Sequence, residues 1–384
     1  MTLDLELALA TWSAISEPGD EFGGMLREAF GPVDALKLVR TEDAEVLAKA
    51  ILSNSSCEPA AERFGNLQKS SADSIQRWLP RLQKTMESPA LRHSLSKVRL
   101  VHQQNIEWPT QLTDLGWGAP AALWVDGNAD LLQKSKKSVA LVGARSSTKY
   151  GEWVTAEIVS QVALRGYSIV SGGAYGIDGA AHRASLAISA DTVAVLAGGI
   201  DRLYPAGNQA MLLEISKTGL LVSELPPGSS PTKWRFLQRN RLIAALTKAT
   251  IVVEAGYRSG SINTANHASL LGREVGAVPG PITSPSSAGC HRLIREGAAT
   301  LISSADDVLE LLGENSATVS ASNSVGALET RALDALGRNP KQLFEIAESA
   351  GLTISEASMA LTSLELAGLA VGAYGKWSRT GSNL

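Results

Sequence analysis

From Ser138 onward, short runs of aliphatic and β-branched residues alternate with segments whose apolar residues recur at helical spacing. The runs that we expect to be buried strands are Val139–Val142, Ser168–Ser171, Thr192–Ala197, Leu220–Ser223, Thr250–Val253 and Val275–Val278. The helical segments between them are Gly151–Leu164, Asp178–Ile188, Asn208–Ser216, Leu237–Thr247 and Ile262–Leu271. Strands that alternate with helices in this way predict an α/β fold with a doubly wound, mostly parallel sheet.

The segments on either side of this pattern differ from it. The residues in front are mostly helical in pattern, and a polar, serine-rich stretch at Glu314–Gly326 predicts a flexible linker. Three short helical patterns and a terminal hairpin follow, which indicates a winged helix; they are Ala327–Leu336, Lys341–Ser349, Ser355–Leu366, Leu369–Tyr374 and Lys376–Arg379. We therefore expect a helical domain, an α/β domain, a linker and a winged-helix domain over residues 1–95, 96–312, 313–326 and 327–384.

The composition is that of an ordinary globular chain, with 44% hydrophobic and 19% charged residues among 384. The two cysteines, Cys57 and Cys290, are too few for a disulfide framework or a multi-cysteine metal site, and they favour a reducing compartment. No run of about 18 apolar residues predicts a membrane span. Asp4 and Glu6, with no basic residue nearby, argue against a signal peptide. We expect a cytoplasmic protein without a metal or cofactor.

Glycine-rich loops follow several of the predicted strands, at Gly143–Thr148, Ser171–Asp178 and Glu254–Ser261. In an open parallel sheet these loops share the edge where ligands bind, and glycines let backbone amides approach an anion. A phosphate-bearing ligand is therefore favoured over mere tight turns. The first loop begins Gly143-Ala144-Arg145 instead of G-x-G-x-x-G, and no Walker A loop occurs, which disfavours nicotinamide dinucleotides and ATP.

The segment Lys233–Arg241 interleaves four cations with two aromatic residues. Arg235 and Arg239 would share one face of a helix, and we expect Arg239, like Arg145, to be exposed. Cations that follow phosphates and rings that stack on unpaired bases are how proteins hold single-stranded nucleic acid. Residues 133–280 carry 16 basic and 9 acidic residues, although the whole chain has a net charge of −3. This asymmetry fits a polyanionic partner, while an ordinary solvated helix face is the alternative.

Catalytic groups are sparse in the sequence. Asp178 and His182 are one helical turn apart and could form an acid–base pair, but an aspartate at a helix start also serves as a cap. Glu254 is a lone carboxylate at a strand end, and His267 and His291 have no cluster of cysteines or carboxylates beside them for a metal. We therefore expect that the protein is not an enzyme.

Several longer motifs resemble those of the DNA-processing protein A (DprA/Smf) family, in the family's order. They are Gly143-Ala144-Arg145, SGGAYGIDGAAH (Ser171–His182), Tyr204-Pro205 with Asn208, Ser223-Glu224, RNRLIAALT (Arg239–Thr247), VVEAGYRSGSINTA (Val252–Ala265) and AVPGP (Ala277–Pro281). The resemblance implies a Rossmann-like domain between a SAM-like helical domain and a winged helix. It also implies a homodimer that binds and protects single-stranded DNA and loads the RecA recombinase in natural transformation and recombination.

The motifs and the basic segment together give the candidate contacts with single-stranded DNA. These are Gly143, Arg145, Ser146, Ser147, Gly172, Gly173, Gly176, Lys233, Phe236, Arg239, Asn240, Arg241, Ser259 and Gly260. The alternative is a related Rossmann-type phosphoribohydrolase of nucleoside monophosphates, which would need a P-G-G-x-G-T-x-x-E run where this chain has Glu254–Ser261. In the C-terminal module, Thr353–Gly368 contains no Lys or Arg, so we expect that module to contact protein and not DNA.

Overall fold

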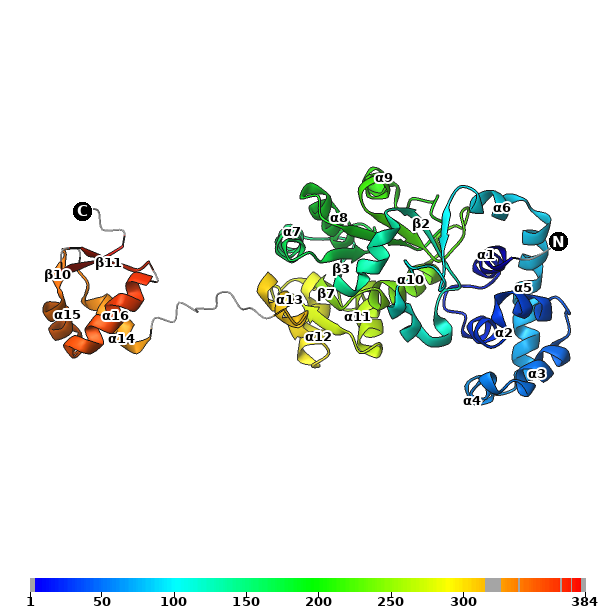
Figure 1. The fold of residues 1–384 in the computed structure, drawn as a ribbon, viewed down its shortest axis with the longest axis horizontal. Coiled ribbons are helices and arrows are strands. Elements are labelled where there is room, and N and C mark those ends of the chain that lie inside the picture. The colour runs from blue at the N-terminus through cyan, green and yellow to red at the C-terminus, as the bar shows by residue number, and fades with distance from the viewer. Residues whose placement is uncertain (1–3, 315–325, 338, 367, 374, 381–384) are drawn as a thin grey trace. The chain divides into compact units, whose positions relative to one another are not determined.

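The computed structural model describes residues 4–314, 326–337, 339–366, 368–373 and 375–380 (Figure 1). The chain divides into two compact units, Met1–Glu314 and Asn315–Leu384. Most of the linker expected over 313–326 lies outside the described residues, and the expected boundary at residue 95 falls inside the first unit, where it stays a prediction. Within the described part of the chain, no helix is both long and apolar enough to cross a membrane.

A nine-stranded sheet forms the centre of the first unit, in the order β1-β2-β6-β5-β4-β3-β7-β8-β9. Its strands are β1 (Arg99–Val101), β2 (Leu123–Gly127), β3 (Ser138–Gly143), β4 (Ser168–Ser171), β5 (Thr192–Leu196), β6 (Leu220–Ser223), β7 (Ala249–Glu254), β8 (Glu274–Ala277) and β9 (Thr300–Leu301). Strands β3 to β9 pair in parallel, and β1 and β2 add an antiparallel edge. The predicted doubly wound, mostly parallel sheet is confirmed.

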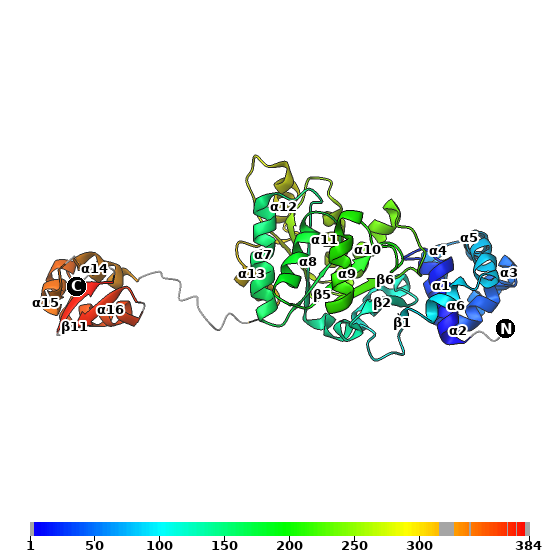
Figure 2. The ribbon, with the colours of Figure 1, turned by 90° about the horizontal axis from the view of Figure 1, so that it is seen from above.

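Helices cover both faces of this sheet (Figures 1 and 2). They are α7 (Lys149–Leu164), α8 (Ile177–Ala187), α9 (Gln209–Thr218), α10 (Lys233–Ala245), α11 (Gly260–Leu270), α12 (Ala288–Arg295) and α13 (Ala305–Leu311). Apolar residues of α10, α11 and α12 join the core on one face, and those of α7, α8 and α13 form the core on the other. Helix α10 begins four residues before the predicted start because the Thr232 side chain caps it by accepting from the amide of Arg235. The cap places Lys233 and Phe236 in the first turn.

Six helices form the front of the first unit, and the first five share a core of their own. They are α1 (Leu5–Ile15), α2 (Glu21–Val39), α3 (Ala44–Ser53), α4 (Ala60–Phe64), α5 (Leu67–Glu87) and α6 (Ala90–Leu95). Trp12 and Trp78 meet edge to face in that core, with ring centroids 5.2 Å apart. Trp124 of β2 donates to Ser13 of α1 (3.0 Å), and Trp117, in the 3-10 segment Thr110–Gly118, stacks on Phe64. Aromatic residues thus join the helical front to the sheet.

The second unit is a winged helix, as predicted. Its elements are α14 (Ala327–Ala335), β10 (Lys341–Gln342), α15 (Leu343–Ala350), α16 (Ile354–Leu366), β11 (Ala370–Ala373) and β12 (Lys376–Arg379). The three strands form an antiparallel sheet in the order β10-β12-β11. The predicted helix at Lys341–Ser349 begins two residues later than expected, because Lys341 and Gln342 pair with β12 instead.

Candidate nucleic-acid interface

The loops after β3, β4 and β7 meet the start of α10 at the carboxyl edge of the parallel strands, where they enclose a pocket of about 310 Å³. The strand order reverses here, because β3 lies between β4 and β7, and such switch points are where open α/β sheets bind ligands. The predicted contacts that line the pocket are Gly143, Arg145, Phe236, Arg239, Asn240, Ser259 and Gly260. The others are not among its lining residues: Ser146, Ser147, Gly172, Gly173, Gly176, Lys233 and Arg241.

Phe236 lines this pocket, and two guanidinium groups lie close to its ring. The centre of the Arg145 guanidinium lies 5.0 Å from the Phe236 ring centroid, and that of Arg239 lies 5.9 Å from it. Arg145 is exposed and, among the described residues, forms no hydrogen bond or ion pair. Its charge is therefore available to a ligand phosphate beside an aromatic ring.

Asp178 occupies the place where glycine loops would hold an anion. It is 7% exposed, and its carboxylate accepts from the amide of Gly172 (3.1 Å). Burial raises the pKa of Asp178, while Arg239 and the amides of Gly172, Ala174 and Gly143 favour its charged form. These amides therefore face a carboxylate of the chain itself, and binding of a phosphate depends on the side chains around the pocket.

The expectation that Arg239 is exposed is wrong. The residue is 6% exposed, and its Nη1 donates to the carbonyls of Gly172 (2.7 Å) and Val195 (2.6 Å). Burial lowers the pKa of Arg239 to about 10, and Asp178 opposes that shift. A Cβ at Gly172 would lie 1.9 Å from the guanidinium, so the glycine is needed for this close contact. Arg239 thus ties α10 to the ends of β4 and β5 and forms the floor of the pocket.

The next two residues of α10 also turn inward. Asn240 donates to the carbonyl of Gly260 (3.2 Å) and to Asn263 (3.2 Å), which holds α10 against the start of α11. Arg241 is 5% exposed and forms an ion pair with Glu224 (2.6 Å). The Arg-Asn-Arg motif therefore fixes the position of α10, and its cations are not on the surface.

The first turn of α10 carries an accessible cation, Lys233. Lys233 is exposed and, within the described residues, has no hydrogen-bond or ion-pair partner. Arg235 does not share a free face with Arg239, because its Nε and Nη2 donate to Glu17 of the helical front (2.9 and 3.0 Å). Ser146 is exposed in the loop after β3. Lys233 and Arg145 are thus two exposed cations beside the pocket that a strand could reach.

Buried side chains hold the loop after β4 in shape. The amide of Gly173 donates to His182 Nε2 (3.2 Å), so the other ring nitrogen carries the proton toward Thr192 Oγ1 (2.8 Å). Burial lowers the pKa of His182 to about 3, so the ring is neutral at pH 7. Asn208 donates to the carbonyls of Gly173 (3.0 Å) and Ala174 (2.9 Å). Asp178 and His182, suggested as an acid–base pair, instead hold the backbone of this loop. Asn208, which the sequence marked only as part of a motif, holds it with them.

The loop after β3 is held by Glu254 at the end of β7. Glu254 is 3% exposed and accepts from both the amide (2.9 Å) and the hydroxyl (2.6 Å) of Thr148, which caps α7. Ser147 donates to Glu152 (2.9 Å). Gly176 has a φ of 77°, and a Cβ there would lie 2.0 Å from the carbonyl oxygen of Ala144, so the first two loops touch at this glycine. Most candidate residues outside the pocket lining therefore hold the loops and the helix that form the pocket.

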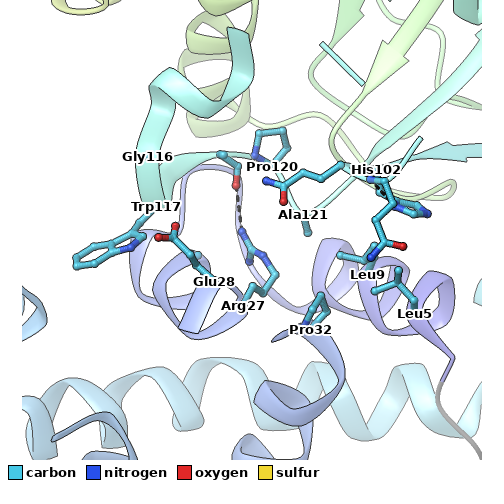
Figure 3. A pocket seen from close by; sticks show the side chains of 14 residues that line it. Leu5, Leu9, Arg27, Glu28, Pro32, His102, Gly116, Trp117, Pro120 and Ala121 are labelled. Atoms are coloured by element: carbon cyan, nitrogen blue, oxygen red, sulfur yellow. Dashed lines mark hydrogen bonds between the residues drawn. The ribbon is translucent and has the colours of Figure 1, made fainter. Parts of the chain in front are cut away.

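A second cavity, of about 160 Å³, lies between α1, α2 and the segment that precedes β2 (Figure 3). The Arg27 guanidinium donates to the carbonyl of Ala119 (3.0 Å), and burial lowers the pKa of Arg27 to about 10. Figure 3 shows Glu28 and Trp117 at one end and His102 at the other. This cavity shares no lining residue with the pocket beside Phe236. It belongs to the junction between the helical front and the sheet.

The sequence and the fold both match known proteins. The profile of DNA recombination-mediator protein A matches residues 99–313, and that of the DprA winged helix domain matches residues 316–376. The chain belongs to the DprA family. A Mycobacterium tuberculosis (strain ATCC 25618 / H37Rv) protein whose name assigns it to DprA is 45% identical over 73% of this chain and 76% of its own length. Protein Smf of Escherichia coli (strain K12) is 36% identical over 79% of this chain and 83% of its own length.

Two solved DprA structures share the fold at 30% identity. That of DprA from Streptococcus pneumoniae has a TM-score of 0.62 and covers 81% of this chain and 98% of its own. That of DprA from Helicobacter pylori, described for its single-stranded DNA binding mode, has a TM-score of 0.51 and covers 57% of this chain and 98% of its own. Membership of the DprA family, inferred above from short motifs, is confirmed over the sheet domain and the winged helix.

Proposed function

We propose that this protein binds single-stranded DNA at the pocket beside Phe236 and acts in DNA processing during transformation and recombination. The observation that carries the proposal is the contact of an exposed arginine, Arg145, with the Phe236 ring at the switch point of the sheet; among the described residues its guanidinium has no hydrogen-bond or ion-pair partner. A guanidinium binds phosphate, and a ring stacks on an unpaired base. The single-stranded DNA binding mode described for the Helicobacter pylori relative supports the same assignment.

The candidate residues fall into two roles in this proposal. Arg145, Ser146, Lys233, Phe236 and the loop Ser259–Gly260 contact the strand. The remaining ones shape the pocket without reaching the phosphates: Gly143, Ser147, Gly172, Gly173, Gly176, Arg239, Asn240 and Arg241.

The proposal extends to a cytoplasmic homodimer that protects single-stranded DNA and loads the RecA recombinase. The family's description as a recombination mediator supports this extension. A non-enzymatic role is also part of it. The carboxylates nearest the pocket, Asp178 and Glu254, accept hydrogen bonds from the chain itself, which leaves the phosphoribohydrolase alternative without a free catalytic acid there. An assay of base release from nucleoside monophosphates tests that alternative.

Fluorescence anisotropy with labelled oligo-dT and blunt duplex DNA, repeated across salt concentrations, tests DNA binding. We expect tighter binding to oligo-dT, with little sequence preference and an affinity that falls steeply with salt, because phosphate contacts release counterions. Equal affinity for the duplex and for oligo-dT would contradict the proposal.

A further inference from the structure

Two tyrosines outside the pocket lining continue the aromatic surface that begins at Phe236. Tyr204, between β5 and α9, is 50% exposed, and its ring centroid lies 5.7 Å from that of Phe236 at an interplanar angle of 55°. Tyr175, in the loop after β4, is 48% exposed. Three rings from three separate segments thus lie along the carboxyl edge of the sheet.

The Tyr175 ring is fixed in place although it is half exposed. Its hydroxyl accepts from the amide of Gly207 (3.1 Å), three residues after Tyr204 in the same loop. A Cβ at Gly207 would lie 2.8 Å from that hydroxyl, so the loop approaches the ring closely. The contact joins the loop after β4 to the loop after β5, and it presents the Tyr175 ring next to the Tyr204 segment.

A cation accompanies this part of the edge. Arg183 of α8 is exposed and, among the described residues, forms no hydrogen bond or ion pair, although its charge interacts with the Glu152 carboxylate of α7. Its Nη1 and the carbonyl oxygen of Ala174 lie 3.0 and 3.1 Å from the position that a Cβ of Gly179 would occupy. The guanidinium is therefore beside the residue that precedes Tyr175. Arg145 is the second cation of this edge, and its guanidinium lies over the Phe236 ring.

Neither tyrosine belongs to a hydrophobic core. Both are absent from the clusters of buried apolar residues and from the partly buried residues packed against them. Single exposed aromatics are common and need no explanation, but a row of three with two exposed arginines beside it matches the pattern that holds single strands. Phosphates are bound by the cations, and successive bases stack on the rings.

We propose that Tyr204 and Tyr175 stack bases of the same strand that Phe236 and Arg145 hold, with Arg183 binding a phosphate beside Tyr175. The proposal rests on the single-stranded DNA binding proposed above and gives that strand a path. From the pocket beside Phe236, it crosses the loop after β5 toward the loop after β4. The ligand that it names is a run of unpaired bases, and any base suffices because every base has a π face.

The test compares oligo-dT with an abasic sugar–phosphate strand of the same length, using the full chain. Tyr204→Leu and Tyr175→Leu should each weaken oligo-dT binding about tenfold, or 1.4 kcal/mol, and leave binding of the abasic strand unchanged. Tyr204→Phe should keep the wild-type affinity, because stacking needs the ring and not the hydroxyl. Phe344→Leu is the matched control, since Phe344 is an exposed aromatic residue (55%) on α15 of the second unit.

The outcomes separate the two proposals. If the wild-type chain does not bind oligo-dT, the proposed function fails. If it binds and the tyrosine variants behave like Phe344→Leu, the path fails while the proposed function stands. Equal losses for oligo-dT and the abasic strand would show that the tyrosines only support the loops. Photocrosslinking with iodouracil-substituted DNA should place adducts on Tyr204 and Tyr175 in the wild-type chain, and adducts on Phe236 alone would also overturn the path.

Discussion

The start of α10 and helix α16 are both placed by their folds where nucleic acid is commonly bound, but their surfaces differ. The first turn of α10 presents Lys233 and Phe236, with Arg145 against the ring. Helix α16 holds the recognition position of the winged helix, and its exposed side chains include Ile354 (60%) and Met359 (61%). It has no basic residue.

The difference shows that a fold predicts where a ligand could bind, while the exposed side chains at that place decide whether nucleic acid can bind there. The switch point of a doubly wound sheet and the recognition helix of a winged helix both predict a site. Only the first has cations that a phosphate could reach. In the second, Glu356 accepts from the amide (2.9 Å) and hydroxyl (2.8 Å) of Thr353, so its charge also serves as a cap. We therefore expect DNA binding at the carboxyl edge of the sheet and protein contact at the winged helix.

Removal of Arg239 should have the largest effect on the carboxyl edge. Arg239→Ala leaves Asp178 buried without its nearby cation and leaves the carbonyls of Gly172 and Val195 without a donor. We expect the free energy of unfolding, measured by chemical denaturation, to fall by about 3 kcal/mol. Binding of oligo-dT should fall with it. Lys233→Ala is the control, because an exposed lysine should change stability by less than about 0.5 kcal/mol. Wild-type stability in Arg239→Ala would refute the structural role.

Removal of Arg145 should weaken DNA binding without affecting the fold. The residue is exposed and makes no hydrogen bond among the described residues, so Arg145→Ala should keep the stability of the wild type. Loss of a charge-assisted hydrogen bond to phosphate should cost about 1.5–3 kcal/mol of binding free energy. The salt dependence should fall by about 0.7 in the slope of log K against log salt. Lys217→Ala, in the last turn of α9, is the matched control.

Much of the carboxyl edge could be predicted from the sequence. Strands such as β3 and β7 are buried on both faces, so their sequences are nearly continuous apolar runs. The glycine-rich loops that follow them mark the edge of the sheet where a ligand would bind. The short edge strands were missed. Both residues of β9 are exposed, so no apolar run marks that strand.

The burial of Arg239 could not be predicted from local patterns. Spacing along α10 shows which residues share a face, but it does not show what that face packs against. Here the partners are Gly172, Asp178 and Val195, which are more than 40 residues away in the chain. A glycine whose missing Cβ makes room for a guanidinium is likewise visible only once the fold brings the two segments together.

The pH dependence of stability should report on the buried support of the loop after β4. Burial lowers the pKa of His182 to about 3 in the folded chain, below its usual value of about 6.5 in an unfolded one. The unfolded chain therefore binds one more proton between these values. The contribution is fully present above about pH 6.5 and is lost as the pH falls, by up to about 1.4 kcal/mol per pH unit.

His182→Asn removes this titration and keeps a side chain that can accept from the amide of Gly173. The free energy of unfolding of the variant, measured by urea denaturation between about pH 4 and 6.5, should depend on pH less steeply than that of the wild type. The raised pKa of Asp178 acts in the opposite direction in both proteins, so it cancels from the difference. Identical slopes would mean that His182 is protonated in the folded chain or is not buried there.

Deletion of the winged helix should have the smallest effect on DNA binding. A chain that ends at Glu314 keeps the whole pocket beside Phe236, because every residue that lines it belongs to the first unit. We expect its affinity for oligo-dT to stay within about threefold of the full chain, well below the tenfold step that corresponds to 1.4 kcal/mol. Residues 326–384 alone, with no cation on α16, should bind neither oligo-dT nor duplex DNA with micromolar affinity at physiological salt. Micromolar binding by that fragment would show that Lys376 and Arg379 of β12 suffice for a DNA contact without a basic recognition helix. The carboxyl edge and the winged helix would then both bind DNA and would differ only in affinity.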